Sequence, residues 1–170
     1  MALEVRMLGA LSVSHDDGAR LLPASRKVRA LLAYLAISPR AVSRRHLCEL
    51  LWDAPSDPRG ELRWCLSKLR GLLGSSRLVS CGDAVRLDLG DGLVDVLELE
   101  RTAKTGFDAI TADRARELPA MFRGELLEGL EIERCPAFTS WLLAQRRRHG
   151  AWRIALLRRL VEGAVVDDAL

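Results

Sequence analysis

The sequence has little of what catalysis or metal binding uses. It holds three histidines, His15, His46 and His149, and none lies at a spacing typical of a metal site or an activated nucleophile. It contains no glycine-rich phosphate loop, no G-x-S-x-G and no H-E-x-x-H. His46 and Cys48 are close in the sequence, but on a helix they point in different directions. We therefore expect no enzyme activity, no metal and no cofactor.

Long apolar runs and paired cysteines are also missing. No stretch reaches the ~18 uncharged apolar residues that a membrane span needs. The N-terminal MALEVRMLGALSV carries Glu4 and Arg6 and has no cleavage-site pattern, so it is not a signal peptide. The cysteines are scattered without a C-x-x-C pair, and we interpret them as reduced core residues: Cys48, Cys65, Cys81 and Cys135. These absences predict a cytoplasmic protein with no membrane contact.

The net charge of +3 is unevenly distributed along the chain. Residues 20–77 hold twelve Lys or Arg against four Asp or Glu, a net charge of +8. Residues 95–133 hold five against ten, a net charge of −5. A basic block followed by an acidic one predicts a nucleic-acid surface in the first part and a different role for the second; ordinary fluctuation on a solvated surface is the alternative.

The stretch 57–74, DPRGELRWCLSKLRGLLG, is predicted to be a helix. Asp57 is placed to cap it, Pro58 suits the first helical position, and Gly74 suits a left-handed end. An apolar face follows from helical spacing: Leu62, Cys65, Leu66, Leu69, Leu72 and Leu73.

The opposite face of this helix is predicted to be almost bare of side chain. Gly60, Ser67 and Gly71 lie there; Arg59, Arg63 and Arg70 follow one edge, and Lys68 follows the other. A helix that is small in the middle and cationic at its edges fits a major groove while its edges hold phosphates. The alternative is a surface helix with a solvated basic face.

Short elements precede and follow this helix. Strands are expected over LEVRML, ALSVS and 19–22, and helices after the caps Ser25 and Ser43. Arg26, Lys27 and Arg29 crowd a first helical turn, where cations oppose the helix dipole, which favours an anionic partner nearby. RLVS and AVRLDL around residues 81–83 predict a β-hairpin. Small sheet, three helices and hairpin, in this order, predict a winged helix.

Residues 89–92 are a glycine- and aspartate-rich connector, and beyond them the pattern is helical. We expect helices over 96–104 with Asp95 as cap, around 109–118, and from Pro136 to about Val161. Trp141 and Trp152 lie on the apolar stripe of the last helix, which favours a core position over a contact surface. The Arg146–Arg148 run is interpreted as a solvated face, with contact to DNA or to the acidic segment 95–133 as alternatives. The end, GAVVDDAL, has no stop signal, so we expect this to be the front of a longer protein.

Several motifs in order resemble one known architecture. RKVRALLAYLAISP, VSRRHLCELLW, LRWCLSKLRGLLG, GLVDVLELERTA and FRGELLEGL ahead of WLLAQR resemble the SARP-type bacterial transcriptional activators, over about Val5 to Val161. The resemblance implies an α+β fold: an OmpR-like winged helix-turn-helix with a hairpin wing at 1–91, then an all-helical, TPR-like bacterial transcriptional activator domain at 92–170. Two positions depart from the family: 83–86 lack its Gly-Tyr pair, and Trp64 replaces a usually polar residue.

The resemblance also implies function and site residues. It implies a sequence-specific activator that binds the major groove of duplex DNA at repeated sites as a homodimer, with RNA polymerase as a further partner. The DNA-binding residues we expect are Arg44, Arg45, Arg59, Arg63, Trp64, Ser67, Lys68, Arg70, Arg77 and Arg86.

Different roles are expected within that set. Arg63 suits a bidentate contact to guanine, whereas Arg44, Arg45, Arg77 and Arg86 suit phosphates. Trp64 should be exposed; it either touches a base or sugar edge or packs on protein. The competing function is a protein-interaction module that keeps a winged helix without DNA affinity.

Overall fold

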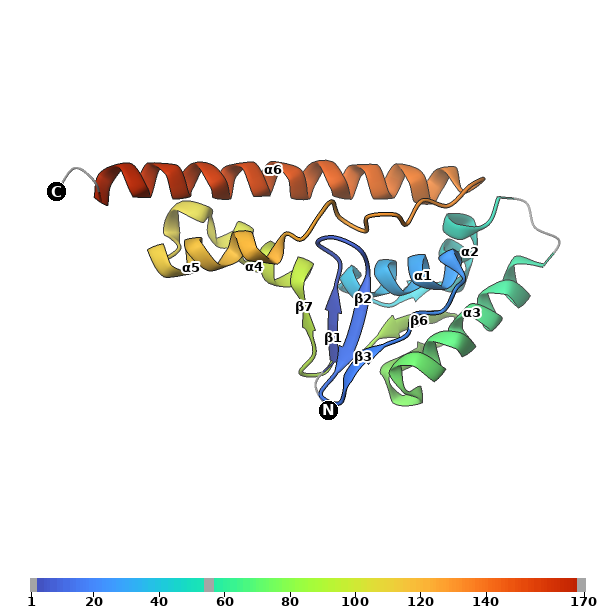
Figure 1. Ribbon diagram of the computed structural model, residues 1–170. Helices are drawn as coiled ribbons and strands as arrows, with labels where there is room; N and C mark the ends of the chain where they lie inside the picture. The colour runs from blue at the N-terminus through green and yellow to red at the C-terminus, as the bar shows by residue number, and fades with distance from the viewer. Residues whose placement is uncertain (1–2, 54–56, 168–170) are drawn as a thin grey trace.

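A computed structural model describes residues 3–53 and 57–167, with side chains to residue 162 (Figure 1). The fold is α+β, with two small sheets and six α-helices in this part of the chain. The elements up to the second sheet are β1 (Leu3–Arg6), β2 (Ser12–His15), β3 (Gly18–Arg20), α1 (Arg26–Ile37), β4 (Val42–Ser43), α2 (Arg44–Leu51), α3 (Pro58–Leu73), η1 (Ser75–Arg77), β5 (Leu78–Cys81) and β6 (Ala84–Leu87). The remaining elements are β7 (Leu93–Val94), α4 (Asp95–Thr105), η2 (Phe107–Ala109), α5 (Ala112–Glu117), η3 (Leu118–Met121) and α6 (Pro136–Asp167).

The first sheet has the order β3-β2-β1-β7. β1 and β2 pair antiparallel with Val5 opposite Val13, and both side chains are buried as the period of two requires. β7 adds to the other edge of β1 in parallel, with Val5 opposite Val94. The residues on both sides of the boundary predicted at 91/92 thus belong to one sheet; the division into two domains stays a prediction.

The second sheet is the predicted hairpin with one added strand. β5 and β6 pair antiparallel around a turn at Gly82, whose φ of +60° is a conformation that glycine tolerates best. β4 pairs with β6, placing Val42 opposite Val85. The amide of Arg44 donates to the carbonyl of Asp83 at 2.8 Å, so the hairpin turn is tied to the start of α2.

The three helices of the first half begin where their caps were expected. Ser25 accepts from the amide of Val28, Ser43 from that of His46 and Asp57 from that of Gly60. α3 packs against both α1 and α2, and all three pack their apolar stripes into one core that also takes side chains from both sheets. Gly74 ends α3 with a φ of +95°, as predicted.

The prediction that Asp95 caps α4 is wrong. Val94 occupies the N-cap position without a side-chain hydrogen bond, and Asp95 is the first helical residue, with a side chain that is almost fully buried. Its carboxylate accepts hydrogen bonds from the amides of Met7 and Leu8, where β1 has ended, as well as from Val96. Burial raises the pKa of this carboxyl, while the three amide donors act in the opposite direction.

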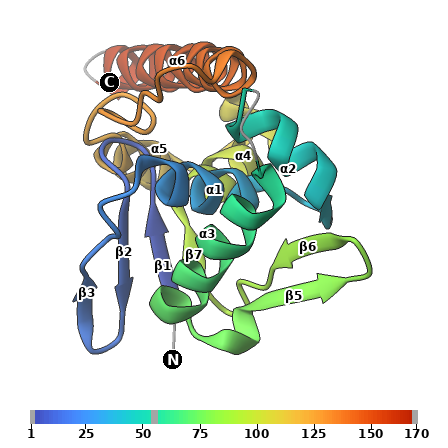
Figure 2. The same cartoon turned by 90° about the vertical axis from the view of Figure 1, so that its right-hand side faces the viewer.

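The second half is less uniformly helical than expected. It contains β7 and a segment without regular helix, 122–135, in which Leu126 bridges to Leu8 and Gly9. α6 extends to Asp167 instead of ending near Val161, because no glycine with positive φ or proline interrupts it. It lies across the other elements as an outer layer (Figures 1 and 2).

The arginine run at the middle of α6 meets the acidic segment, which was one of its three interpretations. Arg146 donates to the carbonyls of Leu126 and Leu127 and forms an ion pair with Glu131 at 2.8 Å. Arg148 pairs with Glu100 of α4 at 2.9 Å. Two of the three arginines, Arg146 and Arg148, therefore bind carbonyls and carboxylates of the protein itself.

The cations in the first turn of α1 likewise have partners within the chain. Arg26 donates to the carbonyl of Glu131, Arg29 donates to that of Pro23, and Lys27 lies 5.1 Å from the ring centre of Trp52. Backbone carbonyls and an aromatic face therefore take the place of the anionic partner expected there.

Aromatic and cysteine side chains are mostly internal. The ring of Trp141 lies 5.1 Å from that of Tyr34, and Trp152 meets His149 edge-on at 4.8 Å, so both tryptophans pack on protein. Three cysteines are buried as expected, whereas Cys81 is exposed beside the hairpin turn. Burial raises the pKa of Cys65 to about 11, so this thiol stays protonated. No helix among the described residues is long and apolar enough to span a bilayer.

Candidate nucleic-acid interface

α3 packs one side against the protein core and leaves the other side exposed to solvent. Leu62, Cys65, Leu66 and Leu69 are at most 1% exposed, and Leu73 is buried beside them. Leu72, predicted on the same face, is half-buried at its edge. Burying a leucine side chain contributes about 1.5–3 kcal/mol. This face therefore fixes the rotation of the helix about its axis, and with it the residues that point outward.

The outward side is bare at two of the three predicted positions. Ser67 and Gly71 are exposed, and a Cβ built on Gly71 would meet no atom within 4 Å. Gly60 differs, because a Cβ there would collide with Oδ2 of Asp57. The capping carboxylate thus covers the first turn. The bare strip consists of Ser67 and Gly71 in the middle and last turns.

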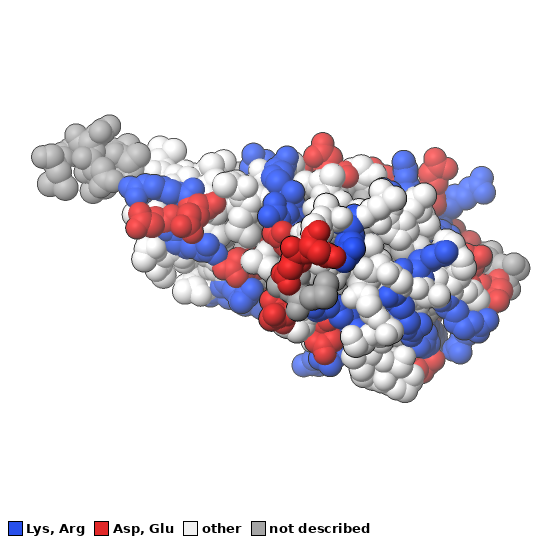
Figure 3. All heavy atoms as spheres, turned by 60° about the horizontal axis from the view of Figure 1, so that its bottom comes forward, with Lys and Arg blue, Asp and Glu red and all other residues white. Residues whose placement is uncertain are grey.

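One edge of the bare strip borders a cationic hollow of about 420 Å³. Four guanidinium groups line it: Arg59, Arg63 and Arg70 from α3, and Arg44 from the start of α2. Leu62 and Leu66 complete its lining, and we call the whole the arginine hollow. Basic side chains are visible at the right-hand end of the molecule, where α3 lies in Figure 1, in the space-filling view (Figure 3).

Three of the four arginines of the hollow have no carboxylate partner among the described side chains, and the fourth has a weak one. Among the residues that the structure describes, Arg59 and Arg70 make no ion pair. Arg44 reaches only the hydroxyl of Ser80, at 3.4 Å. Arg63 lies 4.0 Å from Asp57, with both side chains about two-thirds exposed, which makes the pair weak.

Arginines elsewhere are engaged more closely. Short ion pairs join Arg20 to Asp17 and Arg114 to Glu98, and Arg146 has two carboxylate partners. The arginine hollow therefore concentrates like charges that only the weak Arg63–Asp57 pair offsets in the described part of the chain. An anion there would relieve their mutual repulsion.

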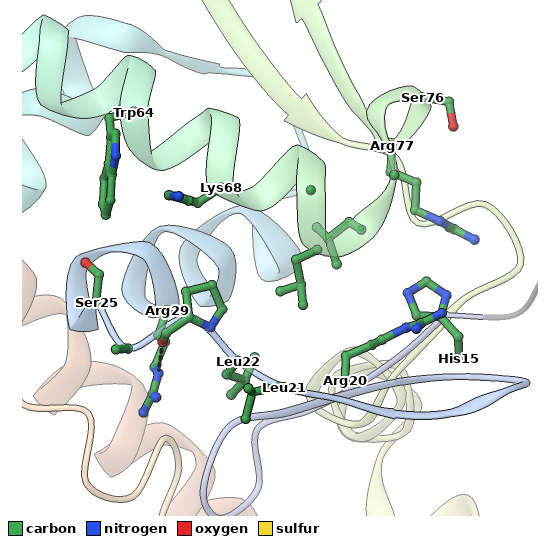
Figure 4. A pocket seen from close by; sticks show the side chains of 16 residues that line it. His15, Arg20, Leu21, Leu22, Ser25, Arg29, Trp64, Lys68, Ser76 and Arg77 are labelled. Atoms are coloured by element: carbon green, nitrogen blue, oxygen red, sulfur yellow. Dashed lines mark hydrogen bonds between the residues drawn. The ribbon is translucent and has the colours of Figure 1, made fainter.

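A wider groove of about 1400 Å³ runs along the other edge of α3 (Figure 4). Trp64 and Lys68 line it from the helix, with Nζ of Lys68 5.4 Å from the ring centre of Trp64. Trp64 is 49% exposed, as predicted. Across the groove lie Leu21, which is 95% exposed, and Arg29. An aromatic face and a cation at an open edge can contact sugars, base edges or an apolar side chain.

Three predicted phosphate contacts lie outside these two surfaces or at their margins. Arg45 is exposed at the start of α2 and pairs with Glu49 at 2.8 Å. Arg77 lines the far end of the Trp64 groove and donates to the carbonyl of Leu89 at 2.6 Å. Arg86 lies on β6, 4.0 Å from Asp88, and faces a different hollow, between α1, α4 and α6.

Arg20 and Leu21 were not expected at the interface. Arg20 ends β3 and Leu21 follows it, and the antiparallel pairing of β2 and β3 carries both toward α3. The only sequence signal was the apolar pair Leu21–Leu22 before Pro23, which a strand explains equally well. Among the described residues, no group of His, Cys, Asp and Glu is placed to hold a metal.

Comparison with known proteins supports the fold. No protein-family model matches the chain, and no curated protein matches it. Among solved structures, the chain is similar to Mycobacterium tuberculosis EmbR, whose structure was determined in complex with a low-affinity phosphopeptide. The TM-score is 0.69 at 22% sequence identity, and the match covers 94% of this chain and 45% of EmbR. The chain thus spans less than half the length of EmbR and shares its fold over nearly all of its own length.

Proposed function

We propose that this protein is a transcriptional regulator that binds duplex DNA in a sequence-specific manner and acts as an activator. The observation that carries the proposal is the arginine hollow beside the bare strip of α3. A cationic edge with a single weak carboxylate contact supplies phosphate contacts, and a strip formed by Ser67 and Gly71 lets the helix backbone come close to base edges.

In this proposal α3 lies in the major groove. Arg63 reads guanine through its two parallel donors, because O6 and N7 are acceptors at matching spacing. Arg59, Arg70 and Arg44 bind phosphates, and Ser67 and Lys68 add contacts on the strip and its other edge. Ser80 holds the Arg44 guanidinium on the side of the hollow, so the hairpin contributes to the interface indirectly. Residues 1–91 form the DNA-binding unit, and 92–170 the helical unit.

Two further features support a regulator of the SARP type. The order of elements agrees with the architecture that the sequence resemblance implies, and the fold likeness to EmbR extends over both halves of the chain. Binding to repeated sites as a dimer and contact with RNA polymerase remain parts of the proposal that follow from the resemblance alone.

Selection of bound duplexes from a randomised oligonucleotide pool tests the proposal directly. We expect one motif to be enriched, and binding to it to weaken steeply with salt, since each phosphate contact releases a counterion. Transcription from a promoter carrying the motif, with and without the protein, tests activation. The competing function, an interaction module without DNA affinity, predicts no enriched motif and no salt-dependent shift with random duplex DNA.

A further inference from the structure

The helix α6 has apolar side chains on two different sides, of which only one packs on the rest of the molecule. Phe138, Leu142 and Leu156 are at most 3% exposed and pack on the rest of the molecule. On a second side, about a third of a turn away, Leu143, Ile154, Leu157 and Val161 are 47, 55, 44 and 64% exposed. α6 forms the outer layer of the molecule in both ribbon views (Figures 1 and 2).

The uncovered residues lie along one straight line. Leu143 and Ile154 are eleven residues apart, and so are Gly150 and Val161. Eleven residues make close to three full turns of an α-helix, so each pair lies on the same side. We call Leu143, Gly150, Ile154, Leu157 and Val161 the outer stripe. A helix that is apolar on both sides is normally covered on both.

Gly150, in the middle of the stripe, is exposed at the edge of a hollow of about 180 Å³ that it lines together with Phe122, Glu125 and Arg146. A Cβ at this position would meet no atom within 4 Å, and its φ is not positive. Glycine inside a helix weakens it, so another side chain would serve the isolated fold better. Because Gly150 has no side chain, however, the backbone of a second helix can approach closely at this position.

Two arginines border the stripe and stand without partners. Arg147 and Arg158, again eleven residues apart, make no hydrogen bond or ion pair with any described residue. Their neighbours Arg146 and Arg148 are instead paired with Glu131 and Glu100. From Pro136 to Val161 the helix contains no Asp or Glu at all. The border of the outer stripe is therefore cationic throughout.

We propose that the outer stripe is the docking surface for an amphipathic helix of a partner protein, with Asp or Glu along the border of its apolar face. The apolar stripe supplies the contact, Gly150 the close approach, and Arg147 and Arg158 select carboxylates. A second copy of α6 fits poorly, because it would bring arginines against arginines. An anionic membrane fits poorly as well, because the stripe has no aromatic side chain to place at the lipid interface. This surface is separate from α3 and independent of DNA binding.

Two synthetic peptides of about 20 residues, long enough to form a helix, test the proposal. Both carry the same leucine and alanine stripe; one is bordered by Glu and the other by Lys. Fluorescence anisotropy with the whole protein should show binding of the Glu-bordered peptide at least ~10-fold tighter than of the Lys-bordered one. The double variant Arg147→Glu/Arg158→Glu should reverse this preference, and Gly150→Leu should weaken binding of both peptides.

Leu93→Asp is the matched control, because it replaces an exposed apolar residue in β7, away from α6, and should leave peptide binding unchanged. Circular dichroism verifies that each variant is folded. Equal binding of the two peptides, or binding of neither by folded protein, would overturn the proposal. So would sedimentation showing a dimer that Ile154→Asp dissociates, which would make a second copy the occupant, or binding to anionic phosphatidylserine vesicles without binding to either peptide.

Discussion

The carboxylate of Asp95 accepts a hydrogen bond from the backbone amide of Met7 at 2.9 Å, across 88 residues of sequence. The same carboxylate serves the amide of Leu8. One buried side chain thus joins the end of β1 to the start of α4, next to the parallel pair β1–β7. The two halves of the chain are connected by a sheet and by this carboxylate, in addition to their shared core.

Replacing Asp95 with alanine should destabilise the protein strongly. Two buried amides would lose their acceptor, and each unsatisfied buried group costs about 1–3 kcal/mol, so a loss of about 2–6 kcal/mol is expected. Urea unfolding followed by circular dichroism measures it. Asp91→Ala, at an exposed position four residues earlier, is the control and should change little. Equal midpoints for the two variants would contradict the structural role of Asp95.

Replacing Arg63 with alanine should cost ~1–3 kcal/mol of binding to the selected DNA and relax specificity at one base pair. Arg70→Ala should instead weaken binding to all sequences alike and reduce the salt slope by about one counterion. Anisotropy titrations at several salt concentrations, with selected and scrambled duplexes, separate the two effects. If both variants lost affinity uniformly, Arg63 would be a phosphate contact rather than a base-reading residue.

Gly71 and Gly74 form a matched pair for testing the bare strip. A Cβ added at either position would meet no atom within 4 Å, but only Gly74 has a positive φ, +95°. Gly71→Ala should therefore raise helix stability by about 0.5–1 kcal/mol, whereas Gly74→Ala should lower the free energy of unfolding. Gly71→Leu should fold equally well and yet weaken DNA binding, because its side chain would hold the helix out of the groove. Unchanged affinity of Gly71→Leu would show that α3 does not enter DNA by this face.

The fluorescence of Trp64 should report DNA binding. It is 49% exposed, whereas Trp52 is buried and Trp141 and Trp152 are half-buried, so it is the most accessible of the four tryptophans. Selected duplex DNA should quench part of the emission in the parent protein and much less in Trp64→Phe. Similar quenching in both would place Trp64 away from the interface, against protein only.

His149 should make the protein sensitive to acid. Burial lowers the pKa of this imidazole, which is 3% exposed and whose Nε2 has no partner among the described residues. The unfolded chain then binds a proton at a higher pH than the folded chain does. Stability is therefore fully present above the unfolded pKa of about 6.5 and falls as the pH drops below it toward the lowered folded value.

His149→Phe keeps an aromatic ring against Trp152 and should flatten this part of the stability–pH curve. Thermal unfolding between about pH 7 and pH 5 measures the change. His46→Gln, at an exposed histidine, is the control and should retain the slope. A parent protein whose unfolding temperature does not change over this interval would contradict the burial of a neutral His149.

Much of the first half follows from local sequence signals. Ser25, Ser43 and Asp57 mark helix starts because a side-chain oxygen before an apolar stripe has few other roles, and Gly74 marks an end by its conformational freedom. Cap and period together define which side of α3 faces outward. The positions of Ser67, Gly71 and Trp64 could therefore be predicted without coordinates.

What could not be predicted depends on long-range contacts. Charge alone does not reveal whether a cation meets DNA or a carbonyl, and Arg26 and Arg29 of α1 proved to donate to Glu131 and Pro23. Asp95 has the residue type and position of a cap, but the amides that it serves come from the far end of the chain. Arg59 and Arg70 have no ion pair among the described residues because the fold brings no carboxylate close to them, and no local pattern encodes this.

The parallel strand β7 has a consequence for dissecting this protein. A fragment ending at residue 91 would keep every residue of α3 and the hairpin. It would, however, expose the edge of β1 and leave the amides of Met7 and Leu8 without the carboxylate of Asp95 as acceptor. Such a fragment would be prone to edge-to-edge self-association. Ending the fragment after α4 instead would retain both the strand and the carboxylate.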